Sequence, residues 1–543
     1  IHSGPSIGSS FPGSPAAGRP GVGLSVAWPR PSGWLPFGWS KARPCSRGPR
    51  LMAAEIRAAP FVSSAVCVGH ADYAGRGLFV TRDVARGELL MVCQAFAVAP
   101  IASLTATVLQ KLRDPGTTAR TRYQFLALDD GQLARQPGLL DLKIDLYRPE
   151  VPCGLEVPPL DASQVDAKRV NRILVVNSQD VESMSETMKI GAAPGRLCQE
   201  AERKEDDLAA VWLLPSLMNH SCVPSVQWGV VDSHYTLAFY ASYDLRAGAE
   251  LTDSYINLFQ SVGNRSEELR SQKSFQCGCR RCEIESTLPS ESVQRVCERF
   301  AEAEARLSRR GDTEAWVKDV VGLSRAAAAL AERQMEVLRV AGRSSCEQYL
   351  LRGAFSEFYT VSCARLENLA GRNLHSASFL QHCCDTSLEA LRVVEQVAPL
   401  SAYHIHYAMM RHKYLCAMSK QSIPEVVLNA AKELFSVWIA RHTTLLQAAS
   451  APISSLALDF MTAVPGAAGQ WAFLVEKSLR EAIALAGAGG KDQSVNGVAA
   501  SPDALGQGLD GSQCQGKQVC SSGEEVMPAS GYGHASSRRF DMD

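Results

Sequence analysis

The chain has no large excess of either charge and no apolar run long enough to cross a bilayer. Its 543 residues carry a formal net charge of -1, which disfavours broad electrostatic binding of nucleic acid. Its 17 cysteines occur without a cleavable signal peptide, a pattern that favours a reducing compartment with thiols used as metal ligands or core residues. We therefore expect an intracellular protein of the nucleus or cytoplasm that contacts neither membranes nor nucleic acid directly.

Acidic residues are missing from the first fifty positions, which are rich in Gly, Pro and Ser. Such a composition cannot build a core, so residues 1–60 are predicted to form a disordered leader. Because the first methionine is Met52, one interpretation is a translated leader or an over-long gene model. The other is a basic transit peptide that would direct the protein to an organelle. Residues 487–543 are rich in Gly, Ser and Gln without a hydrophobic period, which predicts a disordered tail.

Short β-type runs separated by glycine turns dominate residues 61–283. The predicted strands are 65–68, 77–80, 89–92, 173–176 and 235–240. Gly87 and Gly248 each precede a strand, where glycine adopts a positive φ at little cost. Glu88 and Glu250 are therefore interpreted as turn or strand-start residues and not as catalytic acids.

A stretch of mixed character separates the early strands from the later ones. Residues 100–207 combine helix-like and Pro-rich pieces, with helices predicted at 108–113 and 200–211. We interpret this stretch as an insertion into the β-rich part of the chain.

From Pro289 onward the hydrophobic period becomes that of helices. Apolar residues share one helical face in three stretches, Val296, Phe300, Ala303 and Leu307, then Leu380, Cys384, Leu388 and Leu391, then Leu428, Ala431, Leu434, Phe435 and Trp438. Residues 289–486 are predicted to form an all-helical domain, either a bundle or a tetratricopeptide-like stack without a readable repeat signature. The pair Cys383 and Cys384 is interpreted as core packing, and the spacing of His404, His406 and His412 does not favour a metal site.

The run Cys-Gly-Cys-Arg-Arg-Cys at 277–282 is the strongest local signal in the chain. Its three thiols leave one corner of a Zn²⁺ tetrahedron empty, so a closed structural site needs a fourth ligand from elsewhere. Cys222, in the run Asn-His-Ser-Cys, is the natural candidate. The sequence therefore predicts one structural metal site formed by Cys222, Cys277, Cys279 and Cys282.

Several other motifs are weak when each is taken alone. The turn Gly75-Arg76-Gly77 is most often only a tight turn, and Asn219 with His220 is equally consistent with a buried polar pair. Tyr255 and Phe275 have ordinary core packing as their alternative interpretation. The order of the motifs along the chain carries more information than any one of them.

That order resembles the SET-domain protein lysine methyltransferases. The resemblance covers about residues 61–283 and is closest to the class that includes the SET and MYND proteins, in which a helical domain follows the zinc-binding end. It implies an α+β fold, with a β-rich SET domain of small sheets and a pseudoknot, a post-SET zinc site, and the helical domain after it.

The resemblance also implies a function, namely transfer of a methyl group from S-adenosylmethionine to a lysine of a histone or non-histone protein. Tyr255 is the implied catalytic residue, which positions and polarises the reacting groups. The implied cofactor-binding residues are Arg76, Gly77, Leu78, Ser216, Asn219, His220, Tyr255 and Phe275. The implied cofactors are S-adenosylmethionine and one structural Zn²⁺, and the implied partners are a protein substrate and proteins bound by the helical domain.

The chain departs from the pattern of the family at several positions. No Cys and His cluster of a MYND finger occurs between residues 92 and 212. Ser225 stands where an asparagine is common, and Lys273 occupies a place that is often aromatic and lines the lysine channel. Asn177 is a tentative match to an asparagine of the family. These departures keep an alternative open, a catalytically silent SET fold that acts as a zinc-stapled interaction scaffold through its helical domain.

Overall fold

The computed structural model describes residues 58–71, 75–129, 142–151, 165–181, 208–232, 234–343, 349–373, 377–418 and 425–448. By its internal contacts the chain divides into residues 1–499 and 500–543, and every described residue belongs to the first unit. The predicted tail, and the predicted leader as far as residue 57, lie outside the described ranges. Among the helices of the described ranges, none is long and apolar enough to cross a membrane.

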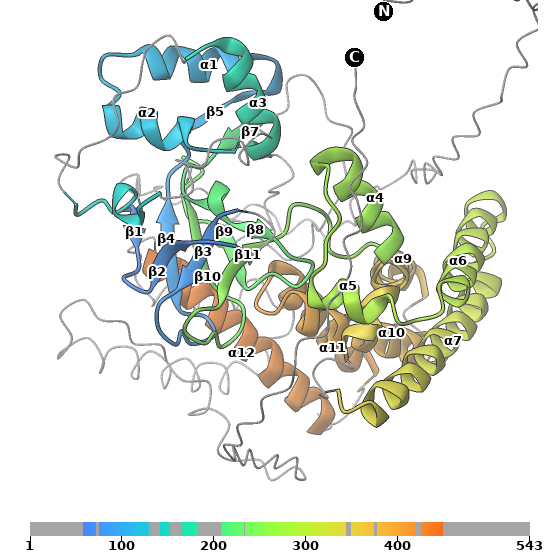
Figure 1. Ribbon diagram of the computed structural model, residues 1–543. Helices are drawn as coiled ribbons and strands as arrows, with labels where there is room; N and C mark the ends of the chain where they lie inside the picture. The colour runs from blue at the N-terminus through green and yellow to red at the C-terminus, as the bar shows by residue number, and fades with distance from the viewer. Residues whose placement is uncertain are drawn as a thin grey trace, which may run out of the picture. The chain divides into compact units, whose positions relative to one another are not determined.

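Three small sheets are built from the strands before residue 254 (Figure 1). The first has the order β1-β4-β10-β9, with strands Phe61–Val62, Leu89–Cys93, Leu237–Ala241 and Val226–Val230. The second has the order β2-β3-β11-β8, with strands Val66–Gly69, Gly77–Val80, Glu250–Asp253 and Asn219–His220. The third has the order β5-β7-β6, with strands Ala97–Pro100, Leu208–Val211 and Gln179–Asp180. Among these pairings only β8 with β11 is parallel.

Glycine turns come just before three of these strands, β3, β4 and β11. Gly75, Gly87 and Gly248 have φ values of 78°, 83° and 85°, a region that favours glycine. Glu250 begins β11 as the sequence predicts. The predicted strands at 77–80 and 89–92 are confirmed in β3 and β4, and those at 65–68 and 235–240 are confirmed with shifted ends in β2 and β10.

The prediction of a strand at 173–176 is wrong, because these residues belong to helix α3, Ala167–Asn177. The carboxylate of Asp166 caps this helix by accepting a hydrogen bond of 2.7 Å from the Arg169 N–H. Val170, Ile173 and Leu174 share the buried face, which packs on α1, Ile101–Arg113. The helical spacing of these three residues, together with the cap, overrides the strand propensity of a β-branched run.

The prediction of a helix at 200–211 is also wrong where the structure can test it. Residues 208–211 form β7, which pairs with both β5 and β6, and residues 200–207 lie outside the described ranges. The helix expected at 108–113 is confirmed as the end of α1. Within the described ranges, the other short helices before residue 220 are α2, Ala119–Leu126, and the 3-10 turns η3, Ile144–Leu146, and η6, Pro215–Leu217.

From α4 onward the described part of the chain is helical, which confirms the predicted change of architecture but places it at Val262, before the expected Pro289. Its elements are α4 Val262–Lys273, α5 Arg280–Glu285, α6 Ser290–Arg310, α7 Thr313–Val340, η7 Leu350–Phe355, α9 Ser356–Asn373, α10 Ala377–Val397, α11 Ala402–Met418 and α12 Glu425–Ala448. Val296, Phe300 and Ala303 are buried on α6 as their spacing predicts. Gly311, with a φ of 67°, ends α6 and lets α7 fold back along it.

The structure also describes the cysteine pair and one of the histidines that the sequence analysis singled out in this region. Cys383 and Cys384 are buried, at 1% and 6% exposure, and burial raises the pKa of each thiol to about 12. Both therefore behave as core residues. His404 is buried and its Nδ1 accepts the Leu400 N–H at 3.1 Å.

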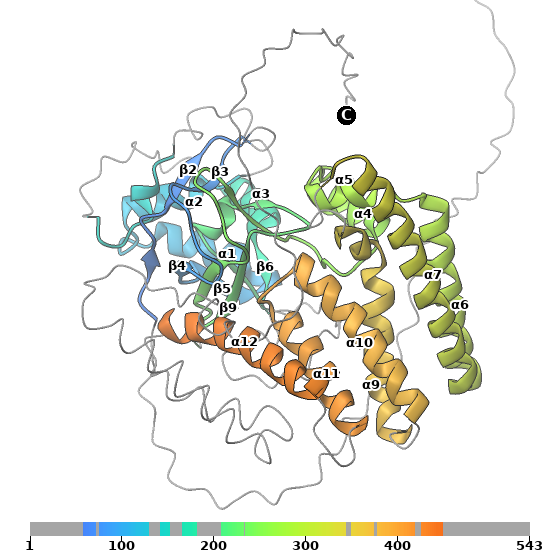
Figure 2. The same cartoon turned by 90° about the horizontal axis from the view of Figure 1, so that it is seen from below.

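Helix α12 packs on the first sheet, beside β4 and β10 (Figures 1 and 2). The buried guanidinium of Arg441 donates to the hydroxyl of Tyr240, to the Leu400 carbonyl at 3.1 Å and to the Trp228 carbonyl at 3.3 Å. The Thr444 hydroxyl donates to the Gly87 carbonyl at 2.8 Å. The helical region is thereby attached to the strands by buried polar contacts.

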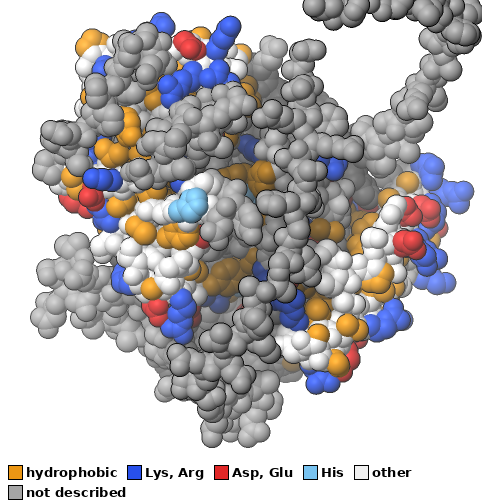
Figure 3. Space-filling model, viewed as in Figure 1, with side chains coloured by type: hydrophobic (Ala, Val, Ile, Leu, Met, Phe, Trp, Pro, Cys, Tyr) orange, Lys and Arg blue, Asp and Glu red, His pale blue; other side chains and the backbone are white. Residues whose placement is uncertain are grey.

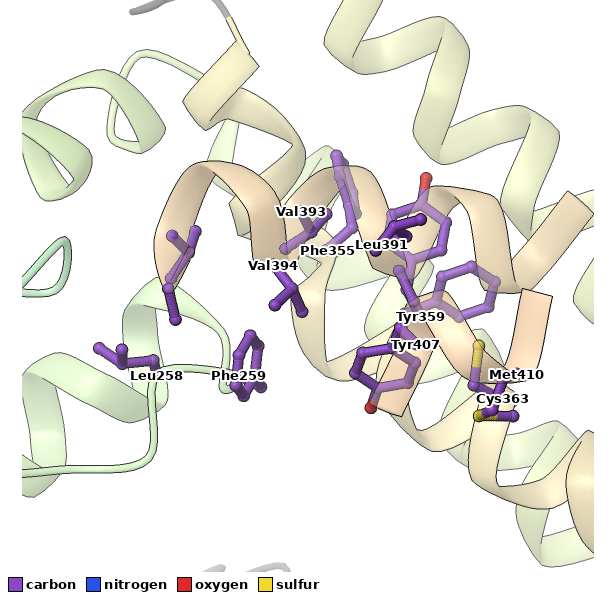
Figure 4. Packing of buried hydrophobic residues seen from close by; sticks show 14 of the residues in the cluster. Leu258, Phe259, Phe355, Tyr359, Cys363, Leu391, Val393, Val394, Tyr407 and Met410 are labelled. Atoms are coloured by element: carbon purple, nitrogen blue, oxygen red, sulfur yellow. The ribbon is translucent and has the colours of Figure 1, made fainter. Parts of the chain in front are cut away.

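The helices share a hydrophobic cluster with the segment that follows β11. Figure 4 shows Phe259 beside Val394, with Phe355, Tyr359 and Leu391 in the same cluster. Figure 3 shows Lys or Arg and Asp or Glu side chains intermixed along the edge formed by α6 and α7. This edge therefore presents no field of a single sign.

Candidate active site and metal centre

The parallel pairing of β8 with β11 brings the Asn-His run beside the Glu-Leu-Thr-Asp-Ser-Tyr run. Asn219 lies opposite Thr252, and the Asn219 amide donates to the carboxylate of Glu250 at 2.6 Å and to the Arg76 carbonyl at 2.9 Å. A Cβ atom added to Gly77 would lie 2.6 Å from Glu250 Oε1 and 2.9 Å from Asn219 Nδ2. A side chain at position 77 would therefore displace the ends of the Glu250 and Asn219 side chains, which hold the glycine turn and the strand pair together.

The imidazole of His220 connects Tyr255 with the cysteine cluster. The backbone N–H of Tyr255 donates to His220 Nδ1 at 3.0 Å, so this nitrogen is an acceptor. The neutral ring then carries its proton on Nε2, which lies 3.4 Å from Cys222 Sγ. Because both ring nitrogens are engaged within the protein, His220 has only its backbone and its ring face left for a ligand.

Tyr255 lies across the start of the Asn-His run. Its hydroxyl donates to the Met218 carbonyl at 2.5 Å, and the Ser221 N–H donates to the Asp253 carbonyl at 2.9 Å. Removal from water, and then the negative charge of Asp253, raises the pKa of Tyr255 above its ordinary value. The phenol therefore stays protonated at neutral pH and turns its oxygen lone pairs away from Met218.

Three rings meet at this place. The His220 ring centroid lies 5.4 Å from that of Tyr255 and 6.0 Å from that of Phe275, and Phe275 meets Tyr255 edge-on at 6.5 Å. Tyr255 and Phe275 are each 36% exposed, unusual for large aromatic side chains in a packed cluster. A partly open aromatic surface of this kind suits a ligand with a flat ring.

Not all of the predicted site residues contribute their side chains to this place. The side chain of Leu78 is fully buried in the core. The buried guanidinium of Arg76 donates to the Ala127 carbonyl, and the Ser216 hydroxyl donates to the Trp212 carbonyl at 2.6 Å. Asn177 donates to the Asp129 and Ile173 carbonyls at 2.7 Å each. Of these residues, Arg76 reaches the site through its backbone carbonyl.

Two acidic residues of the site were not predicted to matter there. Glu250 was interpreted as a strand-start residue, yet its carboxylate accepts from Asn219. Asp253 is buried beside Tyr255, and desolvation raises the pKa of its carboxyl to about 6. The pairing of strands distant in sequence places both residues, and no local pattern announces such a pairing.

The structure brings the four predicted thiols together. The Sγ atoms of Cys222, Cys277, Cys279 and Cys282 all lie within 4.8 Å of one another. Cys222 and Cys282 are separated by 3.6 Å, and hydrogen bonds from the other three thiols lower the pKa of Cys222. Four clustered sulfur donors with no polar oxygen among them are compatible with Zn²⁺.

A buried ion network surrounds the thiols, which the sequence did not reveal. Glu285 accepts from Arg265 and from Arg281 at 2.5 Å each, and all three side chains are buried. Arg265 Nη2 lies 4.0 Å from Cys282 Sγ. Arg281 also donates to the Leu258 and Gly353 carbonyls at 2.8 Å each. The network joins the cysteine cluster to η7 of the helical region.

With this geometry established, comparison with known proteins shows the class of the fold. Residues 75–256, about a third of the chain, match the family model of the SET domain. The match begins at the glycine turn and ends one residue after Tyr255. The chain therefore contains a SET domain.

Several relatives of this chain are named lysine methyltransferases. The chain is 32% identical over 116 residues to histone-lysine N-methyltransferase SET5 of Scheffersomyces stipitis, covering 19% of this chain and 24% of that one. It is 43% identical over 72 residues to SET5 of Vanderwaltozyma polyspora, covering 13% and 14%. It is 32% identical over 77 residues to protein-lysine N-trimethyltransferase SMYD5 of Gallus gallus, covering 14% and 18%. The chain thus spans a quarter or less of the length of these relatives.

A solved structure is also similar to a broader part of the chain. It is the crystal structure of the SET domain of LSMT bound to lysine and AdoHcy, with 12% sequence identity and a TM-score of 0.21 over 65% of this chain and 88% of that one.

Proposed function

We propose that this protein transfers a methyl group from S-adenosylmethionine to a lysine side chain of a protein substrate, with one structural Zn²⁺ in the four-thiol cluster. One observation supports this most. The parallel pairing of β8 with β11 brings Asn219 and His220 next to Tyr255, and Asn219 is hydrogen-bonded to the glycine turn. The names of the relatives agree with the proposal.

The residues around Gly77 fit the methyl donor. The Gly75–Gly77 turn offers backbone without side-chain obstruction, and Asn219 fixes it through the Arg76 carbonyl. The exposed faces of Tyr255 and Phe275 offer apolar contact for the adenosyl group. When bound, S-adenosylmethionine supplies an electrophilic methyl group on a sulfonium.

The acceptor lysine must lose its proton before it can react. Its ordinary pKa of about 10.4 leaves it almost entirely protonated at neutral pH. Partial removal from water beside the three rings would lower that pKa, and contact with the rings would align the amine with the methyl carbon. The amine lone pair then forms the new C–N bond while the C–S bond breaks, and S-adenosylhomocysteine leaves.

Tyr255 acts in this reaction by position and not as a base. Its hydroxyl proton is committed to Met218 and its pKa is raised, so it cannot take the lysine proton at neutral pH. Its oxygen lone pairs, together with the Met218 carbonyl, are acceptors for the polarised N–H and C–H groups of the reactants. The lysine proton leaves to solvent before methyl transfer.

Two measurements test the function directly. Titration calorimetry with S-adenosylmethionine should show binding, and a transfer assay with a radiolabelled methyl donor on cell extract should label protein. Binding without any labelled protein would favour the catalytically silent scaffold, and absence of binding would contradict the proposal as a whole.

The change Asn219→Ala should weaken binding of S-adenosylmethionine by about tenfold or more, because the hydrogen bond to the glycine turn and the one that ties Asn219 to Glu250 of β11 are both lost. Calorimetry measures the effect. Asn264→Ala is the matched control, since its amide bonds Glu357 away from the turn and its loss should leave the affinity unchanged. Equal affinities of both variants and the wild type would contradict the role given to Asn219.

A further inference from the structure

Lys273 places a cation beside the proposed catalytic tyrosine. Its Nζ lies 5.7 Å from the centroid of the Tyr255 ring and donates to the Val176 carbonyl at 3.0 Å. The two contacts fix the ammonium between the end of α3 and Tyr255, and the side chain is only partly exposed. The long side chain therefore points to the site and not into bulk water.

The backbone explains why Lys273 and Phe275 reach the same place. Lys273 is the last residue of α4, and Ser274 follows in the left-handed region with a φ of 59°. This conformation is uncommon for a residue other than glycine and ends the helix abruptly. The chain thus turns within one residue, and both the ammonium of Lys273 and the ring of Phe275 lie near the ring of Tyr255.

We propose that Lys273 is a specificity residue that selects target lysines flanked by Asp or Glu in the substrate protein. This inference rests on the proposed function. A lysine that approaches Tyr255 brings a second ammonium to within a few ångströms of the first, and like charges repel at this range. A carboxylate next to the target lysine in the substrate offsets that repulsion and is attracted to Lys273 itself.

The same charge has the opposite effect on the chemical step. A neighbouring cation lowers the pKa of the entering lysine and raises the fraction that is neutral and reactive. Binding of a lysine with neutral neighbours is therefore weakened while its reaction, once bound, is not. The charge of the flanking residues should change KM far more than kcat.

A peptide series of equal length tests the proposal, with one central lysine flanked by Glu, Gln or Arg. For the wild type, KM in the transfer assay and Kd by fluorescence anisotropy should both be about tenfold lower for the Glu peptide than for the Gln peptide. This ratio is smaller than the full repulsion between two unit charges at this range would produce. Lys273→Met removes the charge and keeps the length, so the ratio should fall to about twofold or less.

Two further variants separate charge from shape. Lys273→Arg keeps the charge and should preserve the ratio. Arg270→Met removes a cation one turn earlier on α4, where the side chain is 70% exposed and paired with Glu267, and should also preserve it. Thermal melting of all variants checks that each is folded.

The outcomes are distinguishable from those of the proposed function. An unchanged Glu-to-Gln ratio in Lys273→Met, in either KM or Kd, would overturn the inference even if methyl transfer is robust. A radiolabel found on Lys273 itself would also overturn it, because the residue would then be an acceptor. Absence of transfer with every peptide contradicts the proposed function alone, and the binding ratio still decides whether Lys273 selects acidic neighbours.

Discussion

Replacing Tyr255 with phenylalanine should lower methyl transfer by at least about 100-fold while binding of S-adenosylmethionine stays nearly intact. The change removes one oxygen atom from the partly open aromatic surface and leaves the ring that packs against His220 and Phe275. Lost with that oxygen are the hydrogen bond to Met218 and the acceptor lone pairs at the place where the amine and the methyl group meet. Single-turnover transfer with a labelled donor measures the rate, and calorimetry measures the affinity.

Tyr243→Phe is a matched control for this change. The Tyr243 hydroxyl also donates to a backbone carbonyl, that of Gln396, at 2.7 Å, but it joins the segment after β10 to α10 outside the site. Its loss should cost stability of about 1 kcal/mol and leave the rate per folded molecule unchanged. If Tyr255→Phe transfers methyl at the wild-type rate, the role given to Tyr255 is wrong.

The parts of the fold that the sequence predicts are those in which local chemistry decides the outcome. Gly87 and Gly248 mark turns because their φ values suit glycine, and the strands after them begin where expected. The stripe of Val296, Phe300 and Ala303 gives a buried helix face because its spacing matches one side of a helix. Neither feature depends on a distant part of the chain.

The errors occur where tertiary packing competes with local propensity. The run 173–176 is rich in β-branched residues, yet Val170, Ile173 and Leu174 fall on one helical face against α1. Residues 208–211 have no strong strand signal of their own and become a strand because β5 and β6 lie on either side. For residues 208–211 the deciding partners are outside the window in which a pattern is read, whereas the helix Ala167–Asn177 rests on a local cap and local spacing that outweigh the strand propensity.

The candidate site shows the same division. The four thiols were predictable from the number and spacing of the cysteines, whereas Asn219, His220 and Tyr255 were singled out only by the resemblance to the SET-domain methyltransferases. Their contacts were not predictable, since Glu250 meets Asn219 only through the parallel pairing of β8 with β11. The sequence also gave no sign that His220 bridges Tyr255 and Cys222, because each bond depends on which ring nitrogen faces which partner.

The change Cys279→Ser should abolish metal binding and unfold or loosen the region from Cys222 to Glu285. A structural Zn²⁺ contributes about 10 to 16 kcal/mol of apparent folding free energy in small domains, which is as large as the whole stability of an ordinary domain. Elemental analysis of wild-type protein purified without chelator should return about one zinc per chain, and the variant should return almost none. Cys297→Ser, at a partly buried cysteine outside the cluster, is the control and should retain the metal.

The buried arginines extend this effect beyond the metal site. Zn²⁺ with four thiolates carries net negative charge, which, together with Glu285, balances Arg265 and Arg281. Without the metal less negative charge lies beside the two buried guanidinium groups, because hydrogen bonds among the thiols raise the pKa of Cys277 and of Cys282. Since Arg281 also holds the Gly353 carbonyl of η7, hydrogen exchange should accelerate in η7 as well as near the cysteines, while α12 on the first sheet changes less. Normal melting of zinc-free protein, with unchanged exchange in η7, would show that the thiol cluster has no structural metal to lose.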